Sequence, residues 1–218
     1  MKSKPAFYIA VLAVLSGISY GMMFIFHIPI FPAFPFLRLD FADIGVALGA
    51  IMFGPIAALT IAFVKCALYL PFDIPNNVGI GMLSNFICCA TFGLALSFIC
   101  RIKRNDLFLI IGLVAAVLIE TTVALFSNYF IVGRLFILAK GAGYKILLTP
   151  YYIFGYALPF NLIKFGMTAA IAYIIFKALQ RALPPKYDIQ FKNKELPVPN
   201  LKHPDITAPK IPSDVDVL

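Results

Sequence analysis

The sequence predicts an all-α integral membrane protein with six transmembrane helices. Composition is the first reason: 61% of the 218 residues are hydrophobic and only 13% are charged, whereas about a quarter of the residues in a soluble domain are charged. The second reason is a series of apolar runs, several of them near the roughly 20 residues that a helix needs to cross a bilayer. Most of the outer surface is therefore expected to face lipid.

The apolar runs occupy about residues 7–26, 41–53, 56–70, 80–100, 107–132 and 152–179. Each is predicted to form one helix, although the run at 41–53 is short for a complete crossing. Proline and glycine separate the first three runs: prolines 29, 32 and 35 interrupt the chain, Gly54 and Pro55 form a turn, and Pro71 and Pro75 belong to the next loop. The mixed stretch at 133–150 is interpreted as the loop before the last helix.

Basic residues in the connections indicate how the helices are oriented. An even number of crossings puts both termini on one side of the membrane, and lysine and arginine favour the cytoplasmic side. The compact basic connection at 101–104 and the basic end of the last run therefore predict that both termini are cytoplasmic. The formal net charge of +8 does not indicate a nucleic-acid partner, because no basic stripe alternates with aromatic residues.

The membrane domain is predicted to span residues 1–180, followed by a flexible cytoplasmic tail at 181–218. Beyond the last apolar run the chain becomes rich in proline and charge and loses helical periodicity. The four cysteines, at 66, 88, 89 and 100, lie inside apolar runs without the paired spacing of a zinc or redox site. They are interpreted as small buried side chains, so neither a metal nor a cofactor is predicted.

Polar side chains inside the membrane are the candidate functional residues, because each costs free energy unless it has a partner or faces a cavity. Asn161 and Lys164 are three residues apart and therefore share one helix face. Their amide and ammonium groups suit the carbonyl and imide edge of a heterocycle, or a carboxylate. The structural alternative is that Lys164 pairs with Glu120 or Asp43 while Asn161 bonds a neighbouring helix.

Three more sets of residues extend this candidate site. Asn128 precedes two aromatic residues that can stack on a flat ring or form an interfacial belt. Phe36 lies in the first loop and can close a site from outside, and Asn85 and Asp43 are polar positions in neighbouring runs. Asp43 is also expected to form a structural ion pair with Lys65, between the second and third runs.

Small residues line one face of the first helix. They stand at about four-residue spacing, which lets another helix approach closely, although such spacing also arises by chance. This face is a candidate surface for a partner membrane subunit and consists of Ala10, Ala13, Gly17 and Gly21. No G-x-x-x-x-G-K-[ST] sequence is present, so the chain is not expected to bind ATP in the P-loop manner. It also carries no recognisable catalytic triad or metal-protease motif, and an enzyme is not predicted.

Several of these segments together resemble a known family. Pro-Phe-Leu-Arg-Leu-Asp-Phe-Ala-Asp-Ile at 35–44, Phe-Gly-Pro at 53–55 and Lys65 resemble the substrate-binding (S) components of energy-coupling factor (ECF) transporters. Leu-Ser-Asn-Phe at 83–86, Ser-Asn-Tyr-Phe at 127–130 and Pro-Phe-Asn-Leu-Ile-Lys at 159–164 resemble the riboflavin-specific branch in particular. The resemblance covers about residues 7–180, and the last of these elements is also similar to pantothenate-type relatives.

The resemblance implies an S-component-type bundle of six helices in a bacterial cell membrane. It implies a subunit that binds a vitamin from outside with high affinity, and riboflavin is the leading candidate. Asn128, Asn161 and Lys164 would hold the edge of the isoalloxazine ring. The partners it implies are a transmembrane coupling (T) subunit, which would dock on the small-residue face, and two cytoplasmic ATPases. The vitamin is then the transported ligand and not a cofactor.

Other functions stay open at this point. Arg134 follows the 127–130 element and adds a cation that suits an anionic ligand, which keeps pantothenate or a flavin phosphate as alternatives. A stand-alone carrier that couples an ion to Glu120 or Asp43 is a different class of function. A membrane scaffold or a membrane enzyme is a third.

Overall fold

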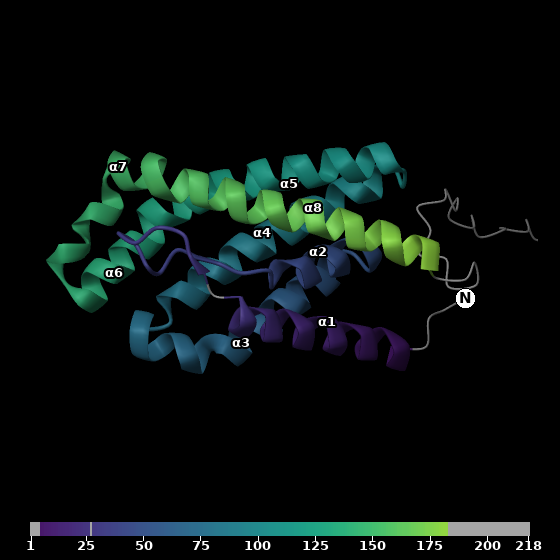
Figure 1. Ribbon diagram of the computed structural model, residues 1–218, viewed down its shortest axis with the longest axis horizontal. Helices are drawn as coiled ribbons and strands as arrows, with labels where there is room; N and C mark the ends of the chain where they lie inside the picture. Colours follow the sequence, from purple (N-terminus) through teal and green to yellow (C-terminus); the bar gives the residue numbers. More distant parts are fainter. Residues whose placement is uncertain (1–4, 27, 183–218) are drawn as a thin grey trace, which may run out of the picture.

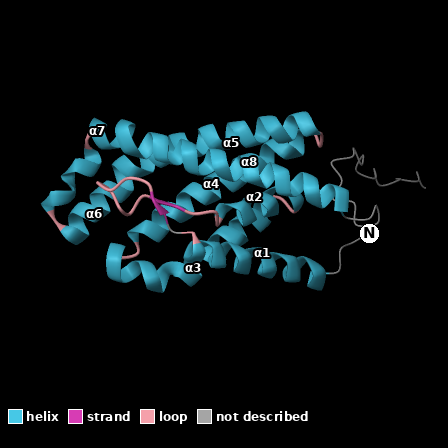
Figure 2. Cartoon of the chain, in the orientation of Figure 1, coloured by secondary structure: helices cyan, strands magenta, loops and turns pink. Residues whose placement is uncertain are grey.

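The computed structural model describes residues 5–26 and 28–182, which form helices apart from one short hairpin (Figure 1; Figure 2). The elements in chain order are α1 (Pro5–Ile25), β1 (Ile28–Pro29), β2 (Arg38–Leu39), α2 (Asp43–Met52), α3 (Pro55–Asn77), α4 (Ile80–Ile102), α5 (Asp106–Ser127), α6 (Gly133–Lys140), α7 (Pro150–Tyr152) and α8 (Leu158–Ala182). Two π-helical turns, Asn128–Val132 and Ile153–Ala157, join α5 to α6 and α7 to α8, and a 3-10 turn, Ala142–Leu148, joins α6 to α7.

Five continuous helical stretches are long and apolar enough to cross a membrane: 6–25, 55–77, 80–102, 106–140 and 150–182. They confirm five of the predicted segments and the all-α membrane fold. The second segment is also a helix, but α2 has only 10 residues, so it is about 15 Å long against a hydrocarbon core of about 30 Å. Whether α2 counts as a sixth crossing stays a prediction.

Two predicted helix ends are wrong. The third run does not stop near residue 70, because α3 continues through Pro71 and Pro75 to Asn77. Breaking a helix in an apolar environment leaves backbone groups unsatisfied, which favours continuing the helix. Proline is tolerated inside membrane helices because neighbouring groups satisfy the few backbone groups that it frees. The stretch after 132 is likewise helical, because α5 continues through a π-helical turn into α6, where Phe136 is buried against Leu147.

The short helix α2 lies in the middle of the bundle, and eight of its 10 residues are buried. It packs with α3, α4 and α8 in one large apolar cluster. Gly93 of α4 allows a close approach in this cluster, because a Cβ placed there would lie 2.8 Å from Ala58 Cβ and 3.0 Å from Val46 Cγ1. A second, aromatic-rich cluster gathers α6, α7 and the segment before β2 at the other end of the molecule.

The start of α1 and the end of α8 lie at the same end of the bundle (Figure 1). This end also carries the α4–α5 connection, since Lys177 of α8 is 2.5 Å from Asp106, the first residue of α5. The basic connection at 101–104 and both described chain ends therefore lie at one end of the bundle. Apart from its first two residues, the predicted tail at 181–218 lies outside the described residues.

Gly93 provides a test of the packing around α2. We expect Gly93→Val to lower the free energy of unfolding by about 1–3 kcal/mol, the usual cost of forcing extra methyl groups into a filled core. Thermal unfolding in detergent measures this change. Gly17→Ala is the matched control, because a Cβ at Gly17 meets no atom within 4 Å. Equal melting temperatures for the two variants would contradict the close approach of α4 to α2 and α3.

Candidate functional site

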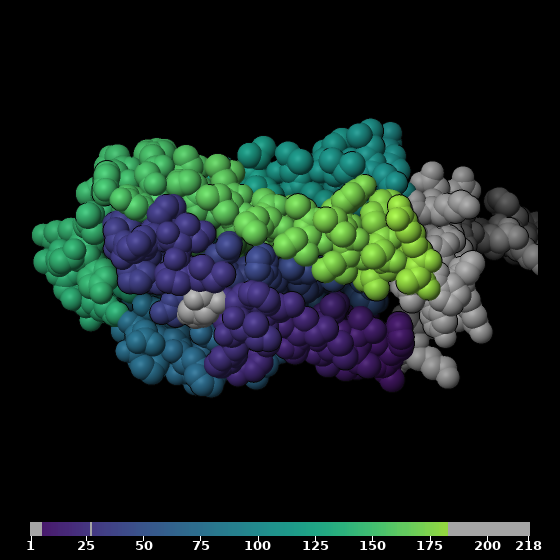
Figure 3. Space-filling view, viewed as in Figure 1, coloured from purple at the N-terminus to yellow at the C-terminus, as the bar shows by residue number. Residues whose placement is uncertain are grey.

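A pocket of about 100 Å³ opens between the segment that leads into α2 (residues 28–42), the helices α3, α4 and α8, and the π-helical turn after α5. It exists because α2 is short, so that a hairpin with two turns, and not a helix, occupies the remaining depth. In Figure 3 the residues before α2 lie on the surface between the beginning of α8 and the end of α3. This segment therefore covers the pocket from one side.

Charged side chains form one wall of the pocket. The ammonium group of Lys164 lies 3.1 Å from Asp40 Oδ2 and 3.1 Å from Asp43 Oδ2. Asp43 also forms an ion pair with Lys65, which confirms the predicted pair between the second and third segments. Two lysines and two aspartates thus alternate in one network whose formal charges cancel, and all four side chains are buried.

This network ties together four separate parts of the chain. Asp40 comes from the covering segment, Asp43 from the first turn of α2, Lys65 from α3 and Lys164 from α8. Asp40 has a second task, because its Oδ1 accepts a hydrogen bond of 3.0 Å from the backbone N–H of Ala42 at the start of α2. A buried charge is costly when its partner is removed, so each of these contacts restrains the position of the Lys164 ammonium.

Two asparagines form the neighbouring wall. The side-chain amides of Asn128 and Asn161 donate hydrogen bonds of 2.8 Å to the carbonyls one turn earlier in their own helices, at Ala124 and Ala157. Tyr152 donates to Asn128 Oδ1 at 3.3 Å. The Oδ1 of Asn161 is then the acceptor available to a ligand. Asn128 begins the π-helical turn at 128–132, and Asn161 lies one helical turn after the π-helical turn at 153–157. Such turns recur at functional sites.

Aromatic rings enclose the space between these polar walls. The rings of Phe36 and Phe136 are 5.5 Å apart and tilted by 31°, and both border the pocket together with Phe160, Phe165 and Tyr69. A planar heterocycle fits such surroundings, because aromatic faces and edges contact flat rings favourably.

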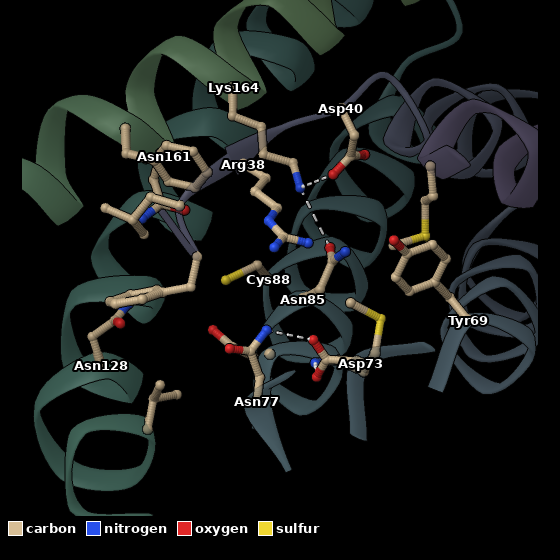
Figure 4. A pocket seen from close by; sticks show the side chains of 18 of the residues that line it. Arg38, Asp40, Tyr69, Asp73, Asn77, Asn85, Cys88, Asn128, Asn161 and Lys164 are labelled. Atoms are coloured by element: carbon tan, nitrogen blue, oxygen red, sulfur yellow. Dashed lines mark hydrogen bonds and ion pairs between the residues drawn. The ribbon is translucent and has the colours of Figure 1, made fainter. Parts of the chain in front are cut away.

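The opposite end of the pocket holds polar residues that the sequence interpretation did not select. Asp73 accepts hydrogen bonds from Asn77 Nδ2 at 2.7 Å and from the backbone N–H of Met82 at 3.1 Å. The guanidinium of Arg38 extends into the space between this end and Lys164 (Figure 4). Asp73 and Asn77 are one helical turn apart, a signal hidden by the wrong prediction that α3 ends before Pro71.

Five of the six predicted substrate-binding residues border this one pocket: Phe36, Asn85, Asn128, Asn161 and Lys164. Asp43 does not border it, because its carboxylate is fully buried behind Lys164. Asp43 contacts Lys164 instead of the pocket, and its direct contact with a ligand stays a prediction. Lys164 pairs with Asp43, one of the two partners named in the structural alternative. The other, Glu120, is fully buried and accepts a 3.3 Å hydrogen bond from Thr121.

Arg134 also lies away from the pocket. It is exposed and its guanidinium lies 6.0 Å from the centre of the Phe130 ring. It therefore provides no charge for a ligand in the pocket. Within residues 5–26 and 28–182, no group of three or more His, Cys, Asp or Glu side chains could hold a metal ion.

The small residues of α1 lie on its outer surface. Ala10, Ala13 and Gly17 are exposed and Gly21 is half-buried. A Cβ placed on either glycine would meet no atom within 4 Å. This face of α1 is thus open to a partner helix.

The comparisons with known proteins agree on one family. The sequence model described as "ECF transporter, substrate-specific component" matches residues 7–176. The chain is 35% identical over 170 residues to the riboflavin transporter RibU of Staphylococcus aureus (strain TCH60), covering 75% of this chain and 85% of the relative. It is 26% identical over 176 residues to the riboflavin transporter FmnP of Bacillus subtilis (strain 168), covering 79% and 91%.

A solved structure, that of the S component of a bacterial ECF transporter, has the same fold. It superposes with a TM-score of 0.68 at 30% sequence identity and covers 82% of this chain and 98% of its own.

The charge network can be tested at Lys65, which does not border the pocket. We expect Lys65→Met to lower the free energy of unfolding by about 3–5 kcal/mol, because it leaves Asp43 buried with one cation fewer. The matched control is Lys177→Met, which breaks the exposed pair with Asp106 and should cost only about 0–1 kcal/mol. Melting temperatures of the two variants provide the measurement, and similar losses would argue against the network.

Proposed function

This chain belongs to the substrate-specific (S) components of ECF transporters, and we propose that it binds riboflavin from outside the cell for import. The substrate is carried over from relatives that are named riboflavin transporters. The observation that supports it in this chain is that the Lys164 ammonium and the Asn161 side-chain carbonyl border the same aromatic pocket. No charged vitamin is needed to explain this pocket, since the two lysines of its network are balanced by two aspartates.

The chemistry of the flavin ring matches these groups. The pyrimidine end of the isoalloxazine has an imide N–H flanked by two carbonyls. Asn161 Oδ1 can accept from the N–H, and Lys164 can donate to an adjacent carbonyl. The ammonium donates hydrogen bonds to Asp40 and Asn85 and forms an ion pair with Asp43, and the Asn85 contact is the longest, at 3.5 Å. A flavin carbonyl would therefore replace Asn85, while the two carboxylates keep the ammonium in place.

Room for the ligand requires a shift of the covering segment. The pocket volume of about 100 Å³ is below the roughly 300–1,000 Å³ of pockets that hold drug-sized ligands. Arg38 is the side chain that extends furthest between the two polar ends (Figure 4). We infer that Arg38 moves toward the outer face when the ring enters, which leaves Asp73 and Asn77 to accept and donate hydrogen bonds with the ribityl hydroxyls.

Import also needs partners that this chain does not supply. We propose that a transmembrane T subunit docks on the exposed small residues of α1 and that two cytoplasmic ATPases provide the energy. The cytoplasmic side would be the end of the bundle that carries both described chain ends. The cluster of basic residues at that end supports this orientation.

Riboflavin binding is tested by titrating the purified protein into riboflavin and following quenching of flavin fluorescence. We expect tight binding by the wild type and a loss of about 1–3 kcal/mol in Asn161→Ala, the cost of an unpaired polar group. Asn76→Ala is the matched control, because Asn76 is exposed and does not border the pocket. Binding by Asn161→Ala at wild-type strength would refute the site. If the wild type does not bind riboflavin but is thermally stabilised by pantothenate, the substrate would be pantothenate.

The docking face has a separate test that does not involve the pocket. We expect Ala13→Trp to abolish riboflavin uptake in cells that contain the complete transporter, because an indole would prevent close contact with a partner helix. Binding by the purified variant should equal that of the wild type. Ile174→Trp, a change at an exposed residue of α8, provides a control for the effect of size. Full uptake by Ala13→Trp would place the docking surface elsewhere.

A further inference from the structure

Helices α5 and α8 lie side by side along the bundle (Figure 1) and leave an apolar groove of about 470 Å³ between them. Small residues on α8 give the groove its depth, and branched residues on α5 form its other wall. Gly166 and Ala170 are two of the small residues, and a Cβ on Gly166 would meet no atom within 4 Å. Tyr173 carries the only polar side-chain group in the lining.

The groove ends at a group of charges. Ile110 and Tyr173 line it at this end, on α5 and α8 respectively. One helical turn beyond them are Asp106 and Lys177, whose charged groups are 2.5 Å apart. Arg181 follows one turn later on the same face of α8 and is exposed.

The charges at this end are mainly positive. The connection before α5 adds Lys103 and Arg104, both exposed, and the Lys103 ammonium lies over the Phe108 ring. Lys177 and Arg181 are the two cations of α8 that lie beside Asp106 where the groove meets the membrane surface.

We propose that this groove binds an anionic phospholipid of the cytoplasmic leaflet, with an acyl chain between α5 and α8 and the phosphate at Lys177 and Arg181. From Tyr173 to Gly166 the groove runs about 10 Å along the helix. It can therefore hold the part of an acyl chain that is nearest the headgroup. Basic pockets between membrane helices on the cytoplasmic side bind anionic headgroups. The inference rests on the orientation proposed above, but not on the identity of the vitamin.

Charge and shape together distinguish this site from the ordinary lipid-covered surface. Ile174 is on the same helix, one residue beyond Tyr173, and is 65% exposed, yet it does not line the groove. An acyl chain at Ile174 would meet a convex surface, whereas at Ala170 it enters a recess. A partner helix could fill the recess, but it would not account for cations gathered at the end of it.

The test compares retention of phosphatidylglycerol and phosphatidylcholine with identical acyl chains, added to the purified full chain in detergent and measured by native mass spectrometry. We expect one retained phosphatidylglycerol per protein and weaker retention of phosphatidylcholine. Arg181→Gln should reduce the preference for phosphatidylglycerol about fivefold, the effect of one cation near an anionic lipid. Ala170→Phe should remove retention of both lipids, and Ile174→Phe should behave as the wild type.

Equal retention of the two lipids, or full retention by Ala170→Phe, would overturn the proposal, because the lipid would then be part of the general shell. A dimer that disappears in Ala170→Phe without bound lipid would assign the groove to a second copy of the chain. Melting temperatures establish that each variant is folded. Riboflavin titrations of the same samples keep a failure of the proposed vitamin site separate from a failure of the lipid site.

Discussion

The alternating network of two aspartates and two lysines is the interaction on which the rest of this structure depends. Its members come from the covering segment, α2, α3 and α8, so four parts of the chain meet at one buried point. Inside a membrane a single unpaired charge is costly, and the two pairs cancel one another. The network therefore fixes both the depth at which α2 begins and the position of Lys164 in the pocket.

The pocket follows from the depth at which α2 begins. Because this helix has only 10 residues, the hairpin segment before it covers the rest of the bundle and leaves space between the helices. Asn128 and Asn161 border this space next to π-helical turns, and their amide nitrogens are held by carbonyls of their own helices. Orientation of the polar groups in advance is what a site with high affinity requires, since less ordering is needed when the ligand binds.

Two parts of the lipid-facing surface are chemically different from the remainder. The small residues of α1 form a flat, open face suited to a helix, whereas the α5–α8 groove is recessed and ends at cations. They lie on different helices. The chain could therefore bind a partner subunit at α1 and a lipid in the α5–α8 groove at the same time. Elsewhere many large apolar side chains are exposed on the helices, as contact with a bilayer requires.

Local patterns in the sequence determined the membrane fold, most helix positions, the shared face of Asn161 and Lys164, and the Asp43–Lys65 pair. These signals act over a few residues or depend on the cost of polar groups in lipid, so no three-dimensional information is needed. Only the tertiary structure showed that Asp40 contacts Lys164 across 124 positions. It also showed that Asp43 and Arg134 do not border the pocket, and that Asp73 and Asn77 lie at its other end. Such contacts depend on how helices pack and on whether a proline interrupts a helix, and tertiary surroundings decide both.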